Sequence, residues 1–115
     1  MKLHSYALSP PSQLSVLVAS HLGLPLEELT VNVMSSENYS EEYKAKNPQA
    51  KVPTLIDDDF VLTESMAIIR YLAHKAGETS LYPSDPKQRA LVDMHLSNMN
   101  DVRRNHILLN YATVI

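Results

Sequence analysis

The chain has 115 residues, enough for one domain with a modest core and a further segment. Its 10 basic and 13 acidic residues give a net charge of −3, and the lysines and arginines are dispersed along the sequence, which argues against a nucleic-acid-binding surface. The absence of cysteine excludes disulfides, thiolate metal sites and dithiol redox chemistry within the chain.

The sequence also lacks signals for membranes and metals. No run approaches the roughly 20 apolar residues needed to span a bilayer, and the N-terminus has no apolar signal-peptide region. We therefore expect a soluble, cytoplasmic protein. The spacing of the histidines predicts no metal site; they are His4, His21, His74, His95 and His106.

The first third of the chain predicts a strand, a helix and a second strand. Residues 3–8 are short and apolar, and Ser9-Pro10-Pro11 then stops the strand and opens a helical pattern. Gly23 is placed to end this helix, and residues 26–33 alternate weakly, as a strand does.

The middle third predicts a short helix, a hairpin and a third helix. Ser40 is a cap for a helix that closes at Asn47. Residues 52–56 and 60–62 flank an acidic turn and predict a hairpin. Apolar residues then recur at helical spacing between Thr63, the expected cap, and Gly77.

The element order β-α-β-α-β-β-α predicts an α/β fold with a mixed four-stranded sheet and helices on both faces, which is the thioredoxin-like arrangement. We expect this domain to occupy residues 1–80, a linker residues 81–86, and a long, kinked or straight, helix residues 87–115.

Several motifs resemble those of glutathione transferases in order and spacing. They are residues 47–55, residues 62–65 with Ala67-Ile68, and Leu81-Tyr82-Pro83. Together with Ser9-Pro10-Pro11, they most resemble the serine-type theta, delta and epsilon classes. The resemblance implies an N-terminal glutathione-binding domain followed by the first helix of a truncated helical domain.

The resemblance also implies a glutathione cradle. Pro53 would be cis, so that the Val52 backbone can pair antiparallel with the cysteinyl residue of glutathione; otherwise Pro53 is a trans proline that starts an edge strand. Ser65 and its N–H would hold the γ-glutamyl carboxylate, and Glu64 would face the γ-glutamyl ammonium. On the residues alone, Glu64 and Ser65 only begin a helix.

Lys51 would supply a cation for the glycyl carboxylate of glutathione, and Gln49 is a weaker candidate for the same end of the tripeptide. Three positions depart from the family pattern. Where family members often carry arginine, histidine and arginine, this chain has Gln13, Ala50 and Met66 respectively.

Ser9 is the candidate catalytic residue. By resemblance, its hydroxyl would donate to the glutathione sulfur and favour the thiolate over the thiol, whose ordinary pKa is about 8.5. Ser9 is equally an ordinary N-cap before prolines. Tyr6 is the runner-up activator of the thiol, or else a packed strand residue. Ser9-Pro10-Pro11-Ser12 stands where thioredoxins carry Cys-x-x-Cys, so dithiol exchange is excluded.

The expected function is therefore conjugation of glutathione, as co-substrate, to small hydrophobic electrophiles without a metal. The alternative is a non-catalytic assembly subunit, because residues 106–115 are apolar and would need a cover. We expect a homodimer or docking into a larger assembly. Candidate interface residues, by resemblance, are Ile69, Leu72, Leu91 and Met94.

Overall fold

The computed structural model describes residues 1–77 and 80–114, with side chains described as far as Arg104. The chain divides into two compact units, Met1–Glu78 and Thr79–Ile115. The elements in chain order are β1 (Lys2–Ser5), α1 (Pro10–His21), β2 (Glu27–Thr30), the 3-10 turns η1 (Val33–Ser35) and η2 (Glu37–Tyr39), α2 (Glu41–Lys46), β3 (Thr54–Asp57), β4 (Phe60–Thr63), α3 (Ser65–Lys75) and α4 (Pro86–Val114).

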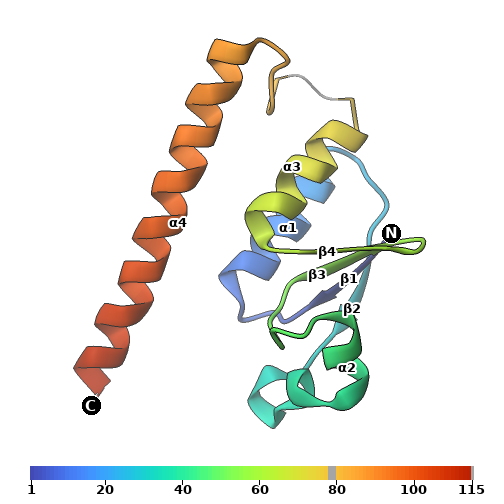
Figure 1. Cartoon of the computed structure of the whole chain (residues 1–115), viewed down its shortest axis with the longest axis vertical. Coiled ribbons are helices and arrows are strands. Elements are labelled where there is room, and N and C mark those ends of the chain that lie inside the picture. Colours follow the sequence, from blue (N-terminus) through green and yellow to red (C-terminus); the bar gives the residue numbers. More distant parts are fainter. Residues whose placement is uncertain (78–79, 115) are drawn as a thin grey trace. The chain divides into compact units, whose positions relative to one another are not determined.

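The first unit is a mixed four-stranded sheet in the order β2-β1-β3-β4. β1 runs parallel to β2 and antiparallel to β3, and β3 forms a hairpin with β4. α1 and α3 pack together against the sheet (Figure 1). The predicted thioredoxin-like fold is confirmed.

The two faces of the sheet differ because side chains alternate along each strand. Leu3 of β1 is paired with Leu55 of β3, and both are fully buried with Ile68 and Leu72 of α3 in one apolar cluster. His4 and Thr54, the next pair in the same register, point to the opposite face. There the ring of His4 meets Tyr43 of α2, which covers this second face.

Local chemistry explains where α1 begins and ends. Ser9 is its N-cap, with prolines in the first two helical positions. At the other end Gly23 has φ 66°, and its N–H and that of Leu24 donate to the carbonyls of Ser20 and Ala19. This pair of bonds satisfies the last carbonyls of the helix in a Schellman motif.

The first two strands are shorter than the sequence predicts. β1 stops at Ser5 because the N–H of Tyr6 turns toward the hydroxyl of Ser12, at 3.4 Å, instead of continuing the ladder. β2 stops at Thr30, and two residues later the Asn32 side chain caps η1 by accepting from Ser35 N–H at 3.1 Å.

Two further expectations are corrected. Thr63 is the last residue of β4, and Glu64 rather than Thr63 occupies the N-cap position of α3. Leu72 and Ile69, expected at a dimer interface, are buried within the first unit. Leu91 and Met94 are exposed on α4. The apolar residues 106–115 lie outside the described side chains.

The second unit consists of the segment before α4 and α4 itself. The hydroxyl of Tyr82 donates to the carboxylate of Asp93 at 3.1 Å, while the guanidinium of Arg89 lies 4.4 Å from the centre of the Tyr82 ring. Arg89 also donates to the Pro83 carbonyl at 2.7 Å. These contacts tie the start of α4 to the segment that leads into it.

Candidate functional site

Three short segments converge at one end of the sheet. His4, near the end of β1, is paired with Thr54 at the start of β3, and Thr54 is also paired with Thr63 at the end of β4. The corner after β1, the loop before β3 and the turn after β4 therefore lie on neighbouring strands, about 4.8 Å apart. Every candidate binding or catalytic residue of the sequence lies in one of these segments.

The corner between β1 and α1 holds Ser9. Its N–H donates to the Tyr6 carbonyl at 2.9 Å, and its hydroxyl accepts from Ser12 N–H at 3.4 Å, as an N-cap does. No described residue accepts the Ser9 hydroxyl proton, so this O–H remains able to donate. The N-cap interpretation is confirmed, and the catalytic role of Ser9 stays a prediction. Tyr6 is half-buried beside this corner.

The loop before β3 is held by side chains that the sequence did not single out. The Lys51 carbonyl lies 2.6 Å from the Tyr43 hydroxyl, 2.9 Å from Asn47 Nδ2 and 3.3 Å from Thr54 Oγ1. Tyr43, Asn47 and Thr54 are all buried, at 4%, 2% and 0% exposure. One carbonyl is thus contacted by three side chains, two from α2 and its C-cap and one from β3.

The preceding residue of this loop is also fixed. Ala50 has φ 55°, in the left-handed region that alanine seldom adopts. Its N–H donates to the Asn47 carbonyl at 2.9 Å, and its carbonyl accepts from Asn38 Nδ2 at 2.8 Å. Such backbone outliers persist only where the surroundings enforce them, and they concentrate at functional sites.

Val52, the next residue but one in this loop, has backbone groups without hydrogen-bond partners. Within the described residues, neither its N–H nor its carbonyl takes part in a hydrogen bond. The bond from Val52 to Pro53 is cis, as the resemblance implies. Lys51 and Gln49 are exposed, and the N–H of Gln49 donates to Asn47 Oδ1 at 3.0 Å. The loop therefore offers a free peptide edge with polar side chains beside it.

The turn after β4 presents the start of α3. Glu64 has φ 69° and ψ 112°, and its side chain makes no capping bond. The Glu64 carbonyl accepts from Ala67 and Ile68, whereas the N–H groups of Ser65 and Met66 have no acceptor among the described residues. Unpaired N–H groups at the positive end of a helix dipole favour a carboxylate.

The residues missed from the sequence are Asn38, Tyr43, Asn47 and Thr54, the four that hold the loop. Both Asn47 and Thr54 belong to the motif at residues 47–55, but the sequence predicted no role for them beyond the end of a helix and a strand position. A polar residue at a strand position buried between Pro53 and Leu55 was the available signal, because buried hydroxyls require partners. The partners themselves come from other elements and leave no local pattern.

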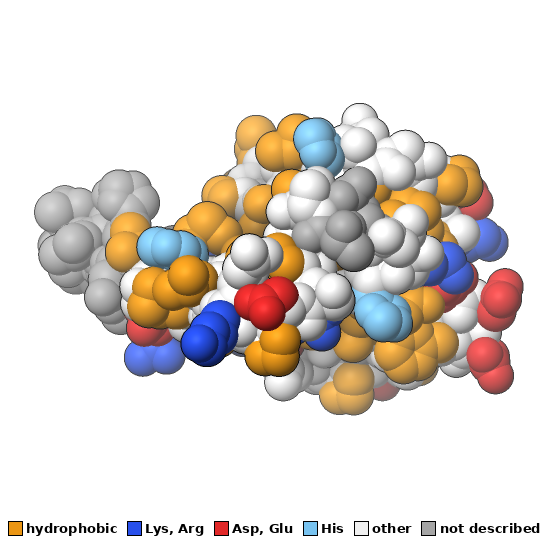
Figure 2. All heavy atoms as spheres, turned by 90° about the horizontal axis from the view of Figure 1, so that it is seen from above, with side chains coloured by type: hydrophobic (Ala, Val, Ile, Leu, Met, Phe, Trp, Pro, Cys, Tyr) orange, Lys and Arg blue, Asp and Glu red, His pale blue; other side chains and the backbone are white. Residues whose placement is uncertain are grey.

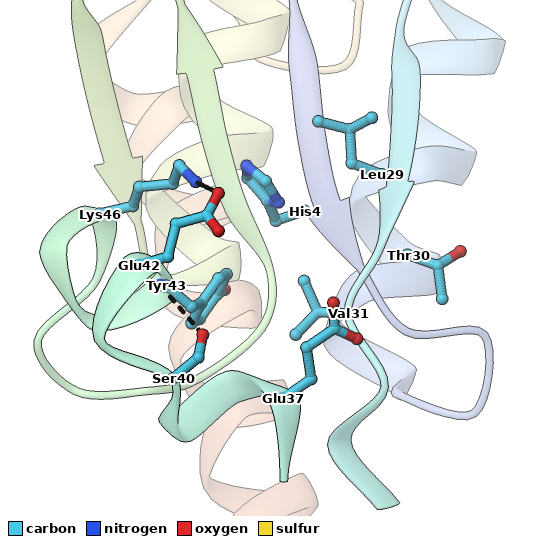
Figure 3. A pocket seen from close by; sticks show the side chains of 9 residues that line it. All are labelled: His4, Leu29, Thr30, Val31, Glu37, Ser40, Glu42, Tyr43 and Lys46. Carbon is cyan, nitrogen blue, oxygen red and sulfur yellow. Dashed lines mark hydrogen bonds and ion pairs between the residues drawn. The ribbon is translucent and has the colours of Figure 1, made fainter. Parts of the chain in front are cut away.

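A small pocket of about 120 Å³ lies on the α2 face of the sheet. Figure 3 shows His4 facing α2 across it, with Glu42 paired to Lys46 at 3.3 Å on one side. Burial is the main cause that lowers the pKa of His4, and the Lys46 charge adds to it, so the imidazole is neutral at pH 7. The lining residues are His4, Leu29, Thr30, Val31, Glu37, Ser40, Glu42, Tyr43 and Lys46.

Other classes of site find little support in the described part of the chain. There, no three histidine or acidic side chains gather where they could hold a metal ion. None of the described helices combines the length and apolar character required to cross a bilayer. On the face seen in Figure 2, basic side chains are interspersed with acidic and hydrophobic ones and form no continuous patch.

The fold and these three segments define a thioredoxin-like domain in which the Val52 backbone and the first N–H groups of α3 have no partners among the described residues. Comparison with known proteins names the family. Residues 3–80 match the family model described as "Glutathione S-transferase, N-terminal domain". The chain is 44% identical over 98 residues to "Glutathione S-transferase 1" of Manduca sexta, covering 84% of this chain and 45% of that protein.

Solved structures agree with the family match. An epsilon-class glutathione S-transferase from the housefly Musca domestica is 44% identical with a TM-score of 0.78, covering 81% of this chain and 43% of that one. Human glutathione transferase theta-2, solved as a complex with glutathione and an unknown ligand, is 39% identical with a TM-score of 0.82, covering 87% and 42%.

The chain belongs to the glutathione S-transferase family, through its N-terminal domain. The resemblance to the serine-type classes is thereby confirmed. The chain spans less than half the length of the curated relatives it matches, 45% and 44% of the first two.

Proposed function

We propose that the first unit binds glutathione along the end of the sheet where β1, β3 and β4 meet. The observation that carries this proposal is the unbonded backbone of Val52, held beside the unbonded N–H groups that begin α3. A tripeptide needs a backbone partner and an anion site, and both lie on neighbouring strands here.

Each group of glutathione then has a partner. The Val52 N–H and carbonyl pair with the cysteinyl residue, next to Pro53. The γ-glutamyl carboxylate takes the N–H and hydroxyl of Ser65, while Glu64 faces the γ-glutamyl ammonium. Lys51 supplies the cation for the glycyl carboxylate, with Gln49 beside it. No step in this mode of binding requires a metal.

The chemistry we propose is conjugation. The Ser9 hydroxyl, whose proton no described residue accepts, donates to the glutathione sulfur at the start of α1. A donor and a helix N-terminus both favour the thiolate, which lowers the pKa of the thiol. The thiolate then attacks a small hydrophobic electrophile, forming a carbon–sulfur bond as the leaving group departs. Tyr6 is the second candidate for the donor.

We extend the proposal to the setting of the reaction. The relatives that match are named as transferases, so a non-catalytic assembly subunit is not favoured. α4 serves as the first helix of the helical domain that continues a transferase after the linker at residues 81–86. The protein works in the cytoplasm as a homodimer, as the family resemblance implies.

Binding is tested by titrating the chain with glutathione in a calorimeter. We expect saturable binding to the wild type and a loss of about tenfold in affinity for Glu64→Gln, equivalent to about 1.4 kcal/mol. Glu41→Gln, on the exposed first turn of α2, is the matched control and leaves binding unchanged. A wild-type chain that does not bind glutathione overturns the proposal.

Conjugation is tested with a chloronitrobenzene as electrophile, by following release of chloride and formation of the thioether. Ser9→Ala should slow turnover about 10²-fold while glutathione still binds, because one positioned donor or proton-transfer group typically contributes 10²–10⁴. Ser20→Ala, an exposed serine of the same helix, should retain the wild-type rate. Equal rates for Ser9→Ala and wild type would remove Ser9 from the mechanism.

A further inference from the structure

The hydrogen bonds in the loop before β3 explain how the Val52 backbone is oriented. We propose that Tyr43, Asn47 and Thr54 form a closed ring of hydrogen bonds that positions the Lys51–Val52 peptide for glutathione, with Tyr43 as the main positioning residue. This inference rests on the proposed function, and it adds residues that do not themselves touch glutathione.

The distances determine which atom donates in each contact. Tyr43 has one hydroxyl proton, and its oxygen lies 2.6 Å from the Lys51 carbonyl, a separation that requires that proton between them. In the contact at 2.9 Å between Tyr43 and Thr54, the donor must then be Thr54. Asn47 Nδ2 has two protons, one for the Lys51 carbonyl at 2.9 Å and one for Thr54 Oγ1 at 3.1 Å.

The resulting ring satisfies every group in it. Asn47 donates to Thr54, Thr54 donates to Tyr43, and Tyr43 and Asn47 both donate to the Lys51 carbonyl, which has two lone pairs. The third contact on that carbonyl, from Thr54 at 3.3 Å, is the longest and is not needed. Bonds in such a ring polarise one another inside a buried site.

The ring fixes the direction of the next N–H. The only cis bond described is Val52–Pro53, so the Lys51–Val52 peptide is trans, and its carbonyl and N–H point in opposite directions within one plane. Because the Lys51 carbonyl points inward to the ring, the Val52 N–H points away from it. This is the N–H that no described residue accepts.

Tyr43 also connects this ring to His4 of β1. Its ring meets His4 edge-on, with centroids 5.6 Å apart, while its hydroxyl reaches Lys51. Burial raises the pKa of Tyr43, and the bond with Thr54 opposes the shift only in part. The hydroxyl therefore stays protonated at neutral pH and remains a donor.

The experiment is a calorimetric titration of four variants with glutathione. Thr54→Val opens the ring but leaves both donors on the Lys51 carbonyl, so it should weaken binding less than Tyr43→Phe does. Tyr43→Phe removes one donor, which the freed Thr54 hydroxyl partly replaces, and should weaken binding about threefold. Tyr43→Phe with Thr54→Val has no replacement and should weaken binding tenfold or more, which is about 1.4 kcal/mol per decade.

Tyr71→Phe is the matched control. The Tyr71 hydroxyl donates to Asp57 at 2.6 Å, so this change also removes one hydroxyl from a short bond to an acceptor, but far along α3 from the loop. We expect it to lower the urea midpoint without changing glutathione affinity. Tyr43→Phe should lower both, which a role in stability alone would not do.

The outcomes separate the two proposals. A wild type that binds, with Tyr43→Phe and the double variant binding equally well, overturns the positioning ring and leaves the glutathione site intact. Additive effects of Tyr43→Phe and Thr54→Val also overturn the ring, because a closed ring requires them to be coupled. A wild type that does not bind overturns both.

Discussion

The two faces of the sheet use neighbouring residues of the same strands for different purposes. On the α1 and α3 face, Leu3 and Leu55 are fully buried in an apolar cluster that provides stability through removal from water. On the α2 face, the adjacent Thr54 belongs to a polar ring that fixes a loop. Burial of apolar side chains stabilises the domain but does not depend on their exact orientation. Hydrogen bonds are directional, and they orient the backbone of the loop before β3.

The largest effect that would test this division is Leu55→Ala. Leu55 is 0% exposed, and such core truncations cost about 2–5 kcal/mol through lost transfer energy and the cavity left behind. Urea unfolding of the variant should show this loss, while the folded fraction keeps its glutathione affinity. Leu8→Ala, at a side chain 79% exposed, should change stability by less than about 0.5 kcal/mol.

A smaller loss should follow Asn47→Ala on the other face. The change removes two donors and the Oδ1 acceptor of the Gln49 N–H, and an unsatisfied buried group costs about 1–3 kcal/mol. Unlike Leu55→Ala, it should weaken glutathione binding in the fraction that remains folded. If both variants affected binding alike, the division of labour between the faces would be wrong.

Asp57, at the edge of the apolar face of the sheet, allows the contribution of a charged group to stability to be tested. Its carboxylate accepts from Lys75 and Tyr71, both at 2.6 Å, and the Lys75 bond is the main cause that lowers the pKa of Asp57 below 3.8. A lowered carboxyl pKa gives stability that is present above pH 3.8 and lost as the pH falls through the folded value. In urea unfolding, the free energy of unfolding of Asp57→Asn should depend less on pH in the acidic range than that of the wild type. Asp59→Asn should keep the wild-type pH dependence.

The smallest effect we expect is a pH dependence from His4. Its pKa in the folded state is below 6.5, so between the folded value and pH 6.5 the unfolded chain binds more protons. Stability should therefore fall as the pH drops below 6.5, and the slope should diminish in His4→Gln. The exposed His21→Gln is the control. If the free energy of unfolding of His4→Gln changed with pH as steeply as that of the wild type, the pH dependence would come from groups other than His4.

The sequence predicted the elements that local chemistry defines. Ser40 caps α2, Gly23 ends α1, and the hairpin turns at Asp58 with φ 55°, each as expected. The cap of α3 was wrong because Thr63, an ordinary cap residue, is taken by the β4 ladder. The site segments could be placed from motifs. The ring around Lys51 could not, because its members meet only when α2 packs on β3.

The Ser9 corner has a practical consequence that follows from its lack of sulfur. Since the chain contains no cysteine, a thiol-reactive dye added to the chain and glutathione can react only with the glutathione sulfur. With the chain in large excess, so that nearly all glutathione is bound, the pH at which that reaction accelerates would report the ionisation of bound glutathione, and no protein thiol would add to the labelling. The wild-type chain can therefore be used in this titration without removing any cysteine first.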